Sequence, residues 1–290
     1  MPKPLFLAVG ADGLRMVSRD GREWSHVQTG REGEVWRAAA FGNGLFVAIG
    51  SYGGDNIMAV SADGQKWKLG KNDAKYSRYL RGLTFGDGWF TALGGEPGSV
   101  GASKPFVLRS RDGETWEGPL EVGGKNILRR AAFGNGRFVG IGDRGRRAGS
   151  ADGKEWKDAT EVRAIDTLID IAFGSGAFVG VGLHGLRMRT LDGIAWTDRV
   201  RGEEGDHLNT IVHNGERFVA IGASSTCTST DGIAWKTVPN AEPPQTAVWG
   251  GGLFVGSAWK GRILTSTDGL KFAETFRAAH AVEALAVGEV

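Results

Sequence analysis

Short apolar runs separated by glycine and small polar residues recur along the whole chain. Representative runs are LFVAIG at 45–50, RFVGIG at 137–142 and AFVGVG at 177–182. Each run has about the length of one β-strand. No stretch carries the apolar period of about 3.6 residues that marks an amphipathic helix. The pattern therefore predicts an all-β protein built from many short strands.

One repeating unit, residues 31–72, illustrates the elements that each repeat predicts. VWRAAAF, LFVAIG, IMAVS and KWKLG are four consecutive candidate strands. The NG of FGNG and the ADG before KWKLG predict tight turns, because Asn, Asp and Gly tolerate a positive φ. Four antiparallel strands in roughly 40 residues make the size of one β-propeller blade.

Two motifs give the number of blades. Heptads of the SRDGREW type occur seven times, with aspartates spaced 37 to 49 residues apart, and copies of FGNGLFVAIG alternate with them. The first unit starts at its second strand, PLFLAVG, and VEALAVG at 282–288 matches the missing inner strand. We therefore predict a seven-bladed β-propeller of four-stranded antiparallel blades, closed by pairing residues 282–288 with residues 4–10 in blade one.

The same spacing predicts the boundaries of the repeats. We expect one propeller domain spanning 1–290. The expected blades are, in order, 281–290 with 1–30, 31–72, 73–121, 122–160, 161–200, 201–240 and 241–280.

The heptad aspartates are interpreted as structural. An Asp side chain can accept hydrogen bonds from the N–H groups of its own turn, and the Ser or Thr two residues earlier can join that network. A sevenfold repeat distributes these groups around a ring, whereas catalysis needs them to converge. The residues expected to fix the turns are Asp20, Asp63, Asp112, Asp152, Asp192, Asp231 and Asp268.

The heptad resembles the Asp-box, or BNR, repeat of sialidase-like and related propellers, and the resemblance covers the whole chain. The heptads have one residue fewer between Asp and Gly than the usual Ser-x-Asp-x-Gly-x-x-Trp form. The chain is also similar to uncharacterised BNR-like propellers of bacteria and to photosystem assembly factors of this architecture. The resemblance implies structural aspartates and a binding role. It does not imply sialidase activity, because the Arg-Ile-Pro signature of sialidases is missing.

Composition narrows the classes of function. The net charge is +2, whereas dedicated nucleic-acid binders usually carry a strong basic excess. No apolar run approaches the length of a membrane span, and MPKPLFLAVG does not resemble a signal peptide. We expect a soluble protein that does not bind nucleic acid; its compartment stays open, and an extracytoplasmic location would require a leader that has been removed.

No cofactor or metal site is predicted. The five histidines are scattered, without a pair at metal-ligand spacing, and the single cysteine, Cys227, is interpreted as a small strand residue. The expected state is a monomer.

The candidate site lies at the end of the ring that carries the variable loops. The FGNG hairpins and the DG turns are expected at one end, and the longer loops at the other, where binding residues concentrate. The residue four positions before the motif Phe is Arg37, Arg81 and Arg129 in three consecutive blades, followed by Ile169, Asn209, Gln245 and Glu283. Guanidinium groups suit carboxylate, sulfate or phosphate oxygens. The predicted ligand-binding residues are Arg37, Arg81, Arg129, Arg130, Tyr79, Asn209, Trp36, Trp259, Arg15, Arg147 and Arg187.

Alternatives stay open for these residues. The arginines could instead bridge neighbouring blades by pairing with acids such as Asp170 or Glu283. Trp36 and Trp259 lie in or beside variable loops, where they could stack on a ligand or simply pack. The weak catalytic candidates are Asp170, Glu283 and His207. Asp170 and Glu283 are expected to face each other across the channel.

The sequence leaves three functions to compare. We expect a non-enzymatic binding or scaffold propeller that recognises a protein or an anionic glycan at the loop-rich end of the channel. One alternative is a glycan-active enzyme, a glycosidase or lyase, with its site in the same place. The other is a structural or assembly factor without a small ligand.

Overall fold

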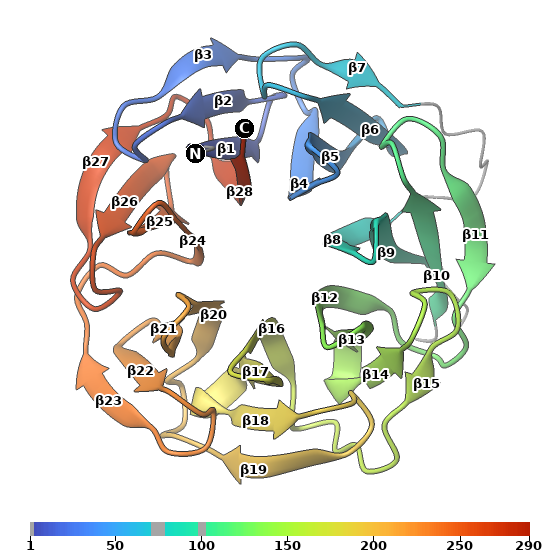
Figure 1. Ribbon diagram of the computed structural model, residues 1–290, viewed down its shortest axis with the longest axis vertical. Coiled ribbons are helices and arrows are strands. Elements are labelled where there is room, and N and C mark those ends of the chain that lie inside the picture. Colours follow the sequence, from blue (N-terminus) through green and yellow to red (C-terminus); the bar gives the residue numbers. More distant parts are fainter. Residues whose placement is uncertain (1–2, 71–78, 98–102) are drawn as a thin grey trace.

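The computed structural model describes residues 3–70, 79–97 and 103–290. In these residues, 28 strands form seven four-stranded antiparallel sheets arranged around a central channel (Figure 1). The only helix within these ranges is in two single 3₁₀ turns, η2 (Asp143–Gly145) and η3 (Leu183–Gly185). The predicted all-β, seven-bladed propeller is confirmed.

Each blade runs from an inner strand at the channel to an outer strand at the rim. From inner to outer, the strands of blades one to seven are β28 (Val282–Glu289), β1 (Pro4–Gly10), β2 (Arg15–Ser18), β3 (Ser25–Gln28); β4 (Val35–Gly42), β5 (Leu45–Tyr52), β6 (Asp55–Ser61), β7 (Lys68–Leu69); β8 (Leu80–Gly86), β9 (Trp89–Pro97), β10 (Ser103–Ser110), β11 (Glu117–Glu121); β12 (Leu128–Gly134), β13 (Arg137–Gly142), β14 (Arg147–Ser150), β15 (Lys157–Asp158); β16 (Leu168–Gly174), β17 (Ala177–Gly182), β18 (Arg187–Thr190), β19 (Trp196–Val200); β20 (Leu208–His213), β21 (Phe218–Gly222), β22 (Ser225–Ser229), β23 (Lys236–Pro239); β24 (Thr246–Gly250), β25 (Leu253–Ala258), β26 (Arg262–Ser266) and β27 (Ala273–Arg277).

The ring closes within blade one. Strand β28 pairs antiparallel with β1, with Leu5 opposite Gly288 and Gly10 opposite Val282. Both ends of the chain therefore lie in the same sheet (Figure 1). This arrangement confirms the predicted closure and leaves no blade without its inner strand.

The core lies between the blades and explains the repeated Phe of the second strand. The Phe rings at this position are fully buried in six blades and 1% exposed in blade one; they are Phe6, Phe46, Phe90, Phe138, Phe178, Phe218 and Phe254. Apolar burial of this kind is the main driving force for stacking the sheets. Because each core cluster is shared by neighbouring blades, as in the cluster that joins Leu7 and Val9 to Phe46, the sheets depend on one another for stability.

The Gly of the FG motif lets the inner strands approach each other closely. A β-carbon on Gly42 would overlap the ring of Phe85 in the next blade, and one on Gly86 would overlap Phe133. The same contact joins Gly174 to His213, which occupies the Phe position of blade six. The motif therefore encodes aromatic-on-glycine contacts between most neighbouring inner strands, whereas Gly250 of blade seven meets Val287 instead.

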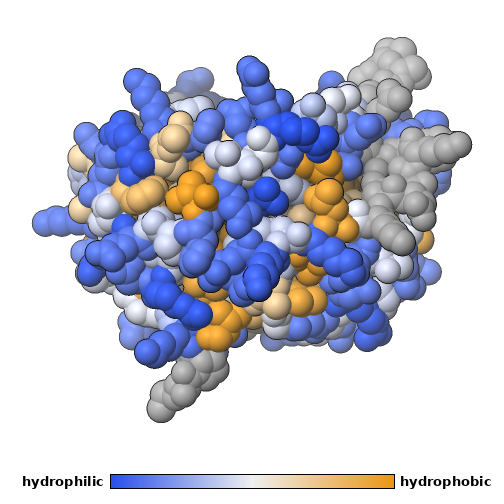
Figure 2. Space-filling view, turned by 90° about the horizontal axis from the view of Figure 1, so that it is seen from above, coloured by the Kyte–Doolittle hydropathy of each residue, from blue (hydrophilic) through white to orange (hydrophobic). Residues whose placement is uncertain are grey.

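The two ends of the ring differ in their connections. At one end, the turn end, the side-chain amide of Asn43 in a hairpin donates to the carbonyls of Gly88 and of Arg111 in the next heptad turn. At the other, the loop end, Asp12 contacts His280, so the second-to-third-strand connections meet the loops between blades. Figure 2 shows the outer wall edge-on, covered mostly by hydrophilic side chains with apolar residues in separate patches.

Candidate binding site at the loop end of the channel

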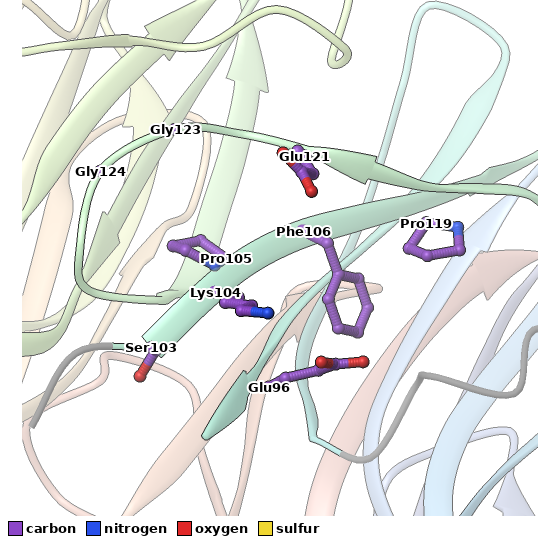
Figure 3. Close-up of a pocket in the computed structure, with 9 residues that line it drawn as sticks. All are labelled: Glu96, Ser103, Lys104, Pro105, Phe106, Pro119, Glu121, Gly123 and Gly124. Atoms are coloured by element: carbon purple, nitrogen blue, oxygen red, sulfur yellow. The ribbon is translucent and has the colours of Figure 1, made fainter. Parts of the chain in front are cut away.

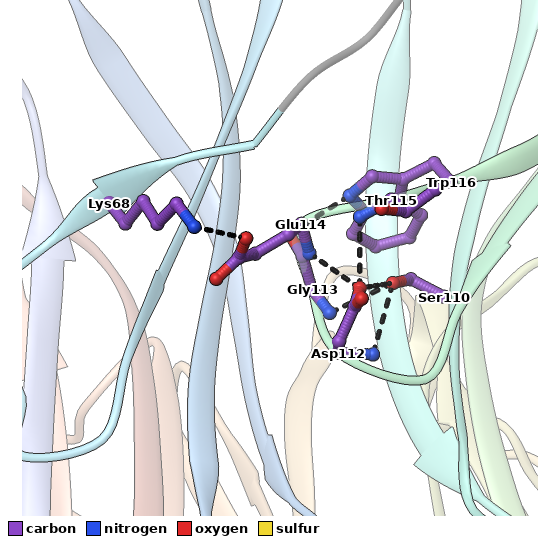
Figure 4. Close-up of polar contacts among 7 residues, drawn as sticks. All are labelled: Lys68, Ser110, Asp112, Gly113, Glu114, Thr115 and Trp116. Atoms are coloured by element: carbon purple, nitrogen blue, oxygen red, sulfur yellow. Dashed lines mark hydrogen bonds and ion pairs between the residues drawn. The ribbon is translucent and has the colours of Figure 1, made fainter.

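The heptad turns are closed networks, as the turn of blade three illustrates (Figure 4). Asp112 Oδ1 accepts hydrogen bonds from the N–H groups of Glu114 at 2.8 Å and Thr115 at 2.9 Å, and from Ser110 Oγ at 3.0 Å. Trp116 Nε1 donates to the carbonyl of Gly113 at 3.1 Å. The carboxylate oxygen thus serves the turn itself, at the end of the ring opposite the variable loops.

The other six turns make the same carboxylate contacts. Asp20, Asp63, Asp152, Asp192, Asp231 and Asp268 each accept from the hydroxyl two residues before and from the N–H groups two and three residues after. In Asp20, the hydrogen bond from the N–H of Glu23 is the main cause of a lowered pKa. These contacts support the structural interpretation of the heptad.

The arginines on the third strands lie between blades, away from the channel. Arg147 is 1% exposed and Arg187 is 7% exposed. Each guanidinium lies near the heptad Trp of the next blade, at 5.5 to 5.9 Å from the ring centroid; the pairs are Arg15 with Trp67, Arg147 with Trp196 and Arg187 with Trp235. The packing of these arginines against Trp could not be predicted from one repeat, because the Trp partner comes from the following repeat.

The predicted aromatic residues have different environments. Trp36 is fully buried in the core between blades one and two, so it offers no exposed face to a ligand. Trp259 is 74% exposed in the connection between β25 and β26, and Tyr79 is 41% exposed just before β8. Residues 98–102, between β9 and β10 of blade three, lie outside the described residues.

The channel arginines do converge at the loop end. They line a cavity of about 370 Å³, here called the funnel, together with acids and backbone from blades one to five. Its charged lining residues are Arg37, Arg81, Arg129, Arg130, Asp143 and Glu283. Four arginines against two acids leave the funnel positively charged.

A β-bulge in the inner strands of blades one to six directs these side chains, whereas β24 of blade seven pairs with β25 without a register shift. The pairing register shifts between Trp36 and Ala38, and in the next blade between Leu80 and Gly82, so Arg37 and Arg81 have no partner in the ladder. Arg129, Ile169, Asn209 and Glu283 occupy the same extra position in their own blades. Bulges redirect a side chain in this way. We call Arg37, Arg81 and Arg129 the bulge arginines.

Glycine in the second strand makes room for each bulge. A β-carbon on Gly50 would overlap the carbonyl oxygen of Val35, and one on Gly94 would overlap that of Tyr79. The final Gly of LFVAIG-type runs is therefore a requirement of the site. Sequence reasoning gave this Gly no function.

The electrostatic state of the three bulge arginines differs. Arg129 forms a bidentate ion pair with Asp143, one contact being Nη2 to Oδ2 at 3.2 Å. Arg37 Nε donates to Ser51 Oγ at 3.4 Å. Burial lowers the pKa of Arg81, and the positive charges of Arg37 and Arg129 lower it further. An anion bound here would relieve this repulsion.

Arg81 has further contacts that hold it in place. The guanidinium of Arg81 lies 5.7 Å from the ring centroid of Tyr79. Arg130 Nη1 donates a hydrogen bond to the backbone carbonyl oxygen of Arg81 at 3.3 Å. The Nε of Arg81 is buried and has no hydrogen-bond partner among the residues that the structure describes. Among the bulge arginines, Arg81 is thus the one most in need of an anionic partner.

The catalytic candidates do not converge. Asp170 Oδ2 accepts from Thr210 Oγ1 at 2.8 Å and from the N–H of Ile211 at 3.0 Å, which ties blade five to blade six. Burial raises the pKa of Asp170, although the charge of Arg130 opposes this. His207 Nδ1 accepts from the N–H of His184 at 3.1 Å. Of the three candidates, only Glu283 lines the funnel.

Asp143 is the charged residue of the funnel lining that sequence reasoning did not predict. It follows the FVGIG run of blade four and begins the turn to the third strand. Asn209 is a half-buried bulge residue that is not part of the funnel lining.

Two further cavities lie outside the channel. One of about 490 Å³ is at the outer side of blade three, between residues of β9 to β11 and Gly123–Gly124, with Glu96, Lys104 and Glu121 as its charged groups (Figure 3). Another of about 440 Å³ lies between the heptad turns of blades four and five. Acids outnumber bases by one in the lining of each, so neither cavity is positively charged as the funnel is.

Within residues 3–70, 79–97 and 103–290, no group of three or more His, Cys, Asp or Glu side chains is placed to hold a metal ion. The helical turns described are far too short to cross a lipid bilayer.

Comparison with known proteins supports the fold. No family model matches the chain, and no curated protein matches it. Among solved structures, it is similar to YCF48 bound to D1 peptide, with a TM-score of 0.67, 16% identity and coverage of 89% of this chain and 86% of that one. It is also similar to Sqt1 of Saccharomyces cerevisiae, with a TM-score of 0.68, 10% identity and coverage of 97% and 84%.

A third similar structure is described as a putative 6-phosphogluconolactonase from Bacteroides fragilis, with a TM-score of 0.70, 10% identity and coverage of 99% and 98%. At these identities the likeness establishes the propeller fold alone.

Proposed function

We propose that this protein is a non-enzymatic binding propeller that holds an acidic segment of a protein partner in the funnel. The observation that carries the proposal is the convergence of Arg37, Arg81 and Arg129 on one cavity from three consecutive bulges. Guanidinium groups recognise carboxylates by paired, charge-assisted hydrogen bonds. One propeller of similar fold is described as bound to a peptide, which agrees with this use of the architecture.

The state of the carboxyl groups favours binding over glycan hydrolysis. Hydrolysis usually needs two carboxyls on either side of one bond. Asp143 is engaged by Arg129, and both oxygens of Asp170 accept hydrogen bonds from the chain. Glu283 is then the one funnel acid in the described residues without an ion pair. The heptad networks support a relationship to Asp-box propellers, in which these turns are structural.

The test is fluorescence anisotropy with a labelled oligoglutamate peptide. Arg81→Ala is expected to weaken binding roughly tenfold or more, because it removes a charge-assisted contact. Arg22→Ala is the matched control, since Arg22 is an exposed arginine in a heptad turn at the other end of the ring. Equal affinity of wild type and Arg81→Ala would refute the proposal, as would tighter binding of oligolysine. Binding of an anionic glycan but not of the peptide would instead support the glycan alternative.

A further inference from the structure

Four connections between second and third strands share one backbone turn at the loop end. In each, the first residue after the second strand is followed by a residue with a positive φ and then by a glycine. The second residues are Asp12, Arg144, His184 and Lys260, with φ of 53°, 52°, 56° and 61°. The first residues of these turns are Ala11, Asp143, Leu183 and Trp259, in blades one, four, five and seven. The backbone is thus constant while the first side chain varies.

The equivalence of these turns places Trp259 at the loop end of the ring, the end at which the funnel lies. Asp143, the first residue of the turn in blade four, lines the funnel directly. Trp259 holds the same position in blade seven. In the ring, β24 and β25 of blade seven lie across the channel from β8 of blade three (Figure 1). Trp259 therefore lies at the loop end of the blade that is across the channel from the bulge arginines.

The side chain of Trp259 is unusual for such a place. It is 74% exposed, which makes it the most exposed of the large apolar side chains in the described residues. The residue after it, Lys260, adopts a left-handed conformation that favours Asn or Gly in tight hairpins. Neither the exposed indole of Trp259 nor the left-handed Lys260 stabilises the fold. Trp is also enriched among the residues that contribute most to binding at protein interfaces.

We propose that Trp259 is the apolar anchor for the protein partner whose acidic segment enters the funnel. This inference rests on the proposed function. The partner segment carries acidic side chains that contact Arg37 and Arg81. It also carries an apolar side chain that packs against the indole of Trp259 on the other side of the channel. The partner segment therefore has an acidic cluster separated from an apolar residue by enough chain to span the channel.

A double-mutant cycle tests this. The probes are an oligoglutamate peptide and a series of the same peptide carrying one Phe at increasing separations from the glutamates through a Gly-Ser spacer. In the wild type, at least one member of the series is expected to bind about tenfold tighter than oligoglutamate. Trp259→Ala removes that gain and leaves oligoglutamate binding unchanged, whereas Arg81→Ala weakens every member. Trp259→Phe retains part of the gain.

Leu191→Ala is the matched control. Leu191 is 56% exposed and lies in a heptad turn at the other end of the ring, so this substitution leaves all affinities unchanged. Because Trp259 is so exposed, Trp259→Ala is expected to keep the thermal midpoint of the wild type.

The outcomes separate the two proposals. If no peptide of the series gains affinity in the wild type, or if the gain persists in Trp259→Ala, the anchor is wrong. If oligoglutamate does not bind but a Phe-containing peptide binds through Trp259, the anchor stands and the funnel assignment fails. If no peptide binds at all, both are refuted.

Discussion

Gly94 lies directly against the carbonyl oxygen of Tyr79, which a β-carbon on Gly94 would overlap. This contact lets β8 bulge, and the bulge turns Arg81 into the funnel. The same relationship joins Gly50 to Val35 beside Arg37. A glycine on the second strand therefore controls the direction of a charged side chain on the first.

Gly94→Ala tests this relationship. The added methyl group is expected to displace the bulge, lower the free energy of unfolding by about 1–3 kcal/mol and weaken oligoglutamate binding as much as Arg81→Ala. Urea denaturation and anisotropy measure the two effects. The control is Gly202→Ala, whose nearest neighbour would be 3.3 Å away and whose φ is not positive. Loss of stability without loss of binding in Gly94→Ala would contradict the assigned link.

Arg147→Met should leave both stability and binding nearly unchanged. Arg147 is 1% exposed, its Nε and Nη1 have no hydrogen-bond partner in the described part of the chain, and its guanidinium lies near the ring of Trp196. Replacing a buried charge by an apolar side chain of similar size is often neutral or stabilising. We expect a change in unfolding free energy within about 1 kcal/mol, or a gain. A clear loss of oligoglutamate affinity would instead indicate that Arg147 contributes to the binding site.

Asp112→Ala should destabilise the protein without affecting binding. It removes the acceptor for the N–H groups of Glu114 and Thr115, with an expected cost of about 1–3 kcal/mol in unfolding free energy. The control is Glu114→Ala, which removes only the exposed ion pair with Lys68 and should cost less than about 1 kcal/mol. Equal costs for the two variants, measured by urea denaturation, would argue against the turn network.

His213 should make stability depend on pH. Burial lowers the pKa of His213, and its Nδ1 accepts a hydrogen bond from the N–H of Gly215 at 3.2 Å. Below about pH 6.5 the unfolded chain binds a proton at this histidine more readily than the folded chain does. Stability from this group is therefore present above that pH and is lost as the pH falls.

His213→Phe is expected to remove this pH dependence, because Phe does not titrate. The substitution should be tolerated, since Phe occupies the same position in four other blades. Urea midpoints measured near pH 7.5 and pH 5.5 should differ less for this variant than for the wild type. The control, His26→Asn, changes an exposed histidine and should behave as the wild type does. An unchanged pH dependence in His213→Phe would show that another group is responsible.

The sequence was sufficient for the fold because each repeat carries its own turns, its own core Phe and its own glycines. The missing inner strand beside PLFLAVG was equally visible, and β28 fills it. The convergence of Arg37, Arg81 and Arg129 followed from alignment of the repeats. The bulge that produces it did not, because a register shift depends on the contact between Gly94 and Tyr79 across the hairpin.

Contacts between repeats were the part that a single sequence could not supply. Arg15, Arg147 and Arg187 stack near tryptophans of the following blade, and Trp36 packs against residues from blade one. Their exposure is decided by how adjacent sheets stack, which a repeat alignment does not contain. Asp143 was missed for a different reason, since its partner Arg129 lies in the same blade: their contact depends on the bulge that turns Arg129 toward the connection after β13.

The most direct test of the central claim follows the arginine Nε–H resonances by NMR during titration with oligoglutamate. The signals of Arg37 and Arg81, assigned by substitution, should shift together and saturate at the affinity measured by anisotropy, while those of Arg22 and Arg147 stay in place. Shifts confined to Arg22 or other arginines of the turn end, with Arg37 and Arg81 unmoved at saturation, would contradict the account.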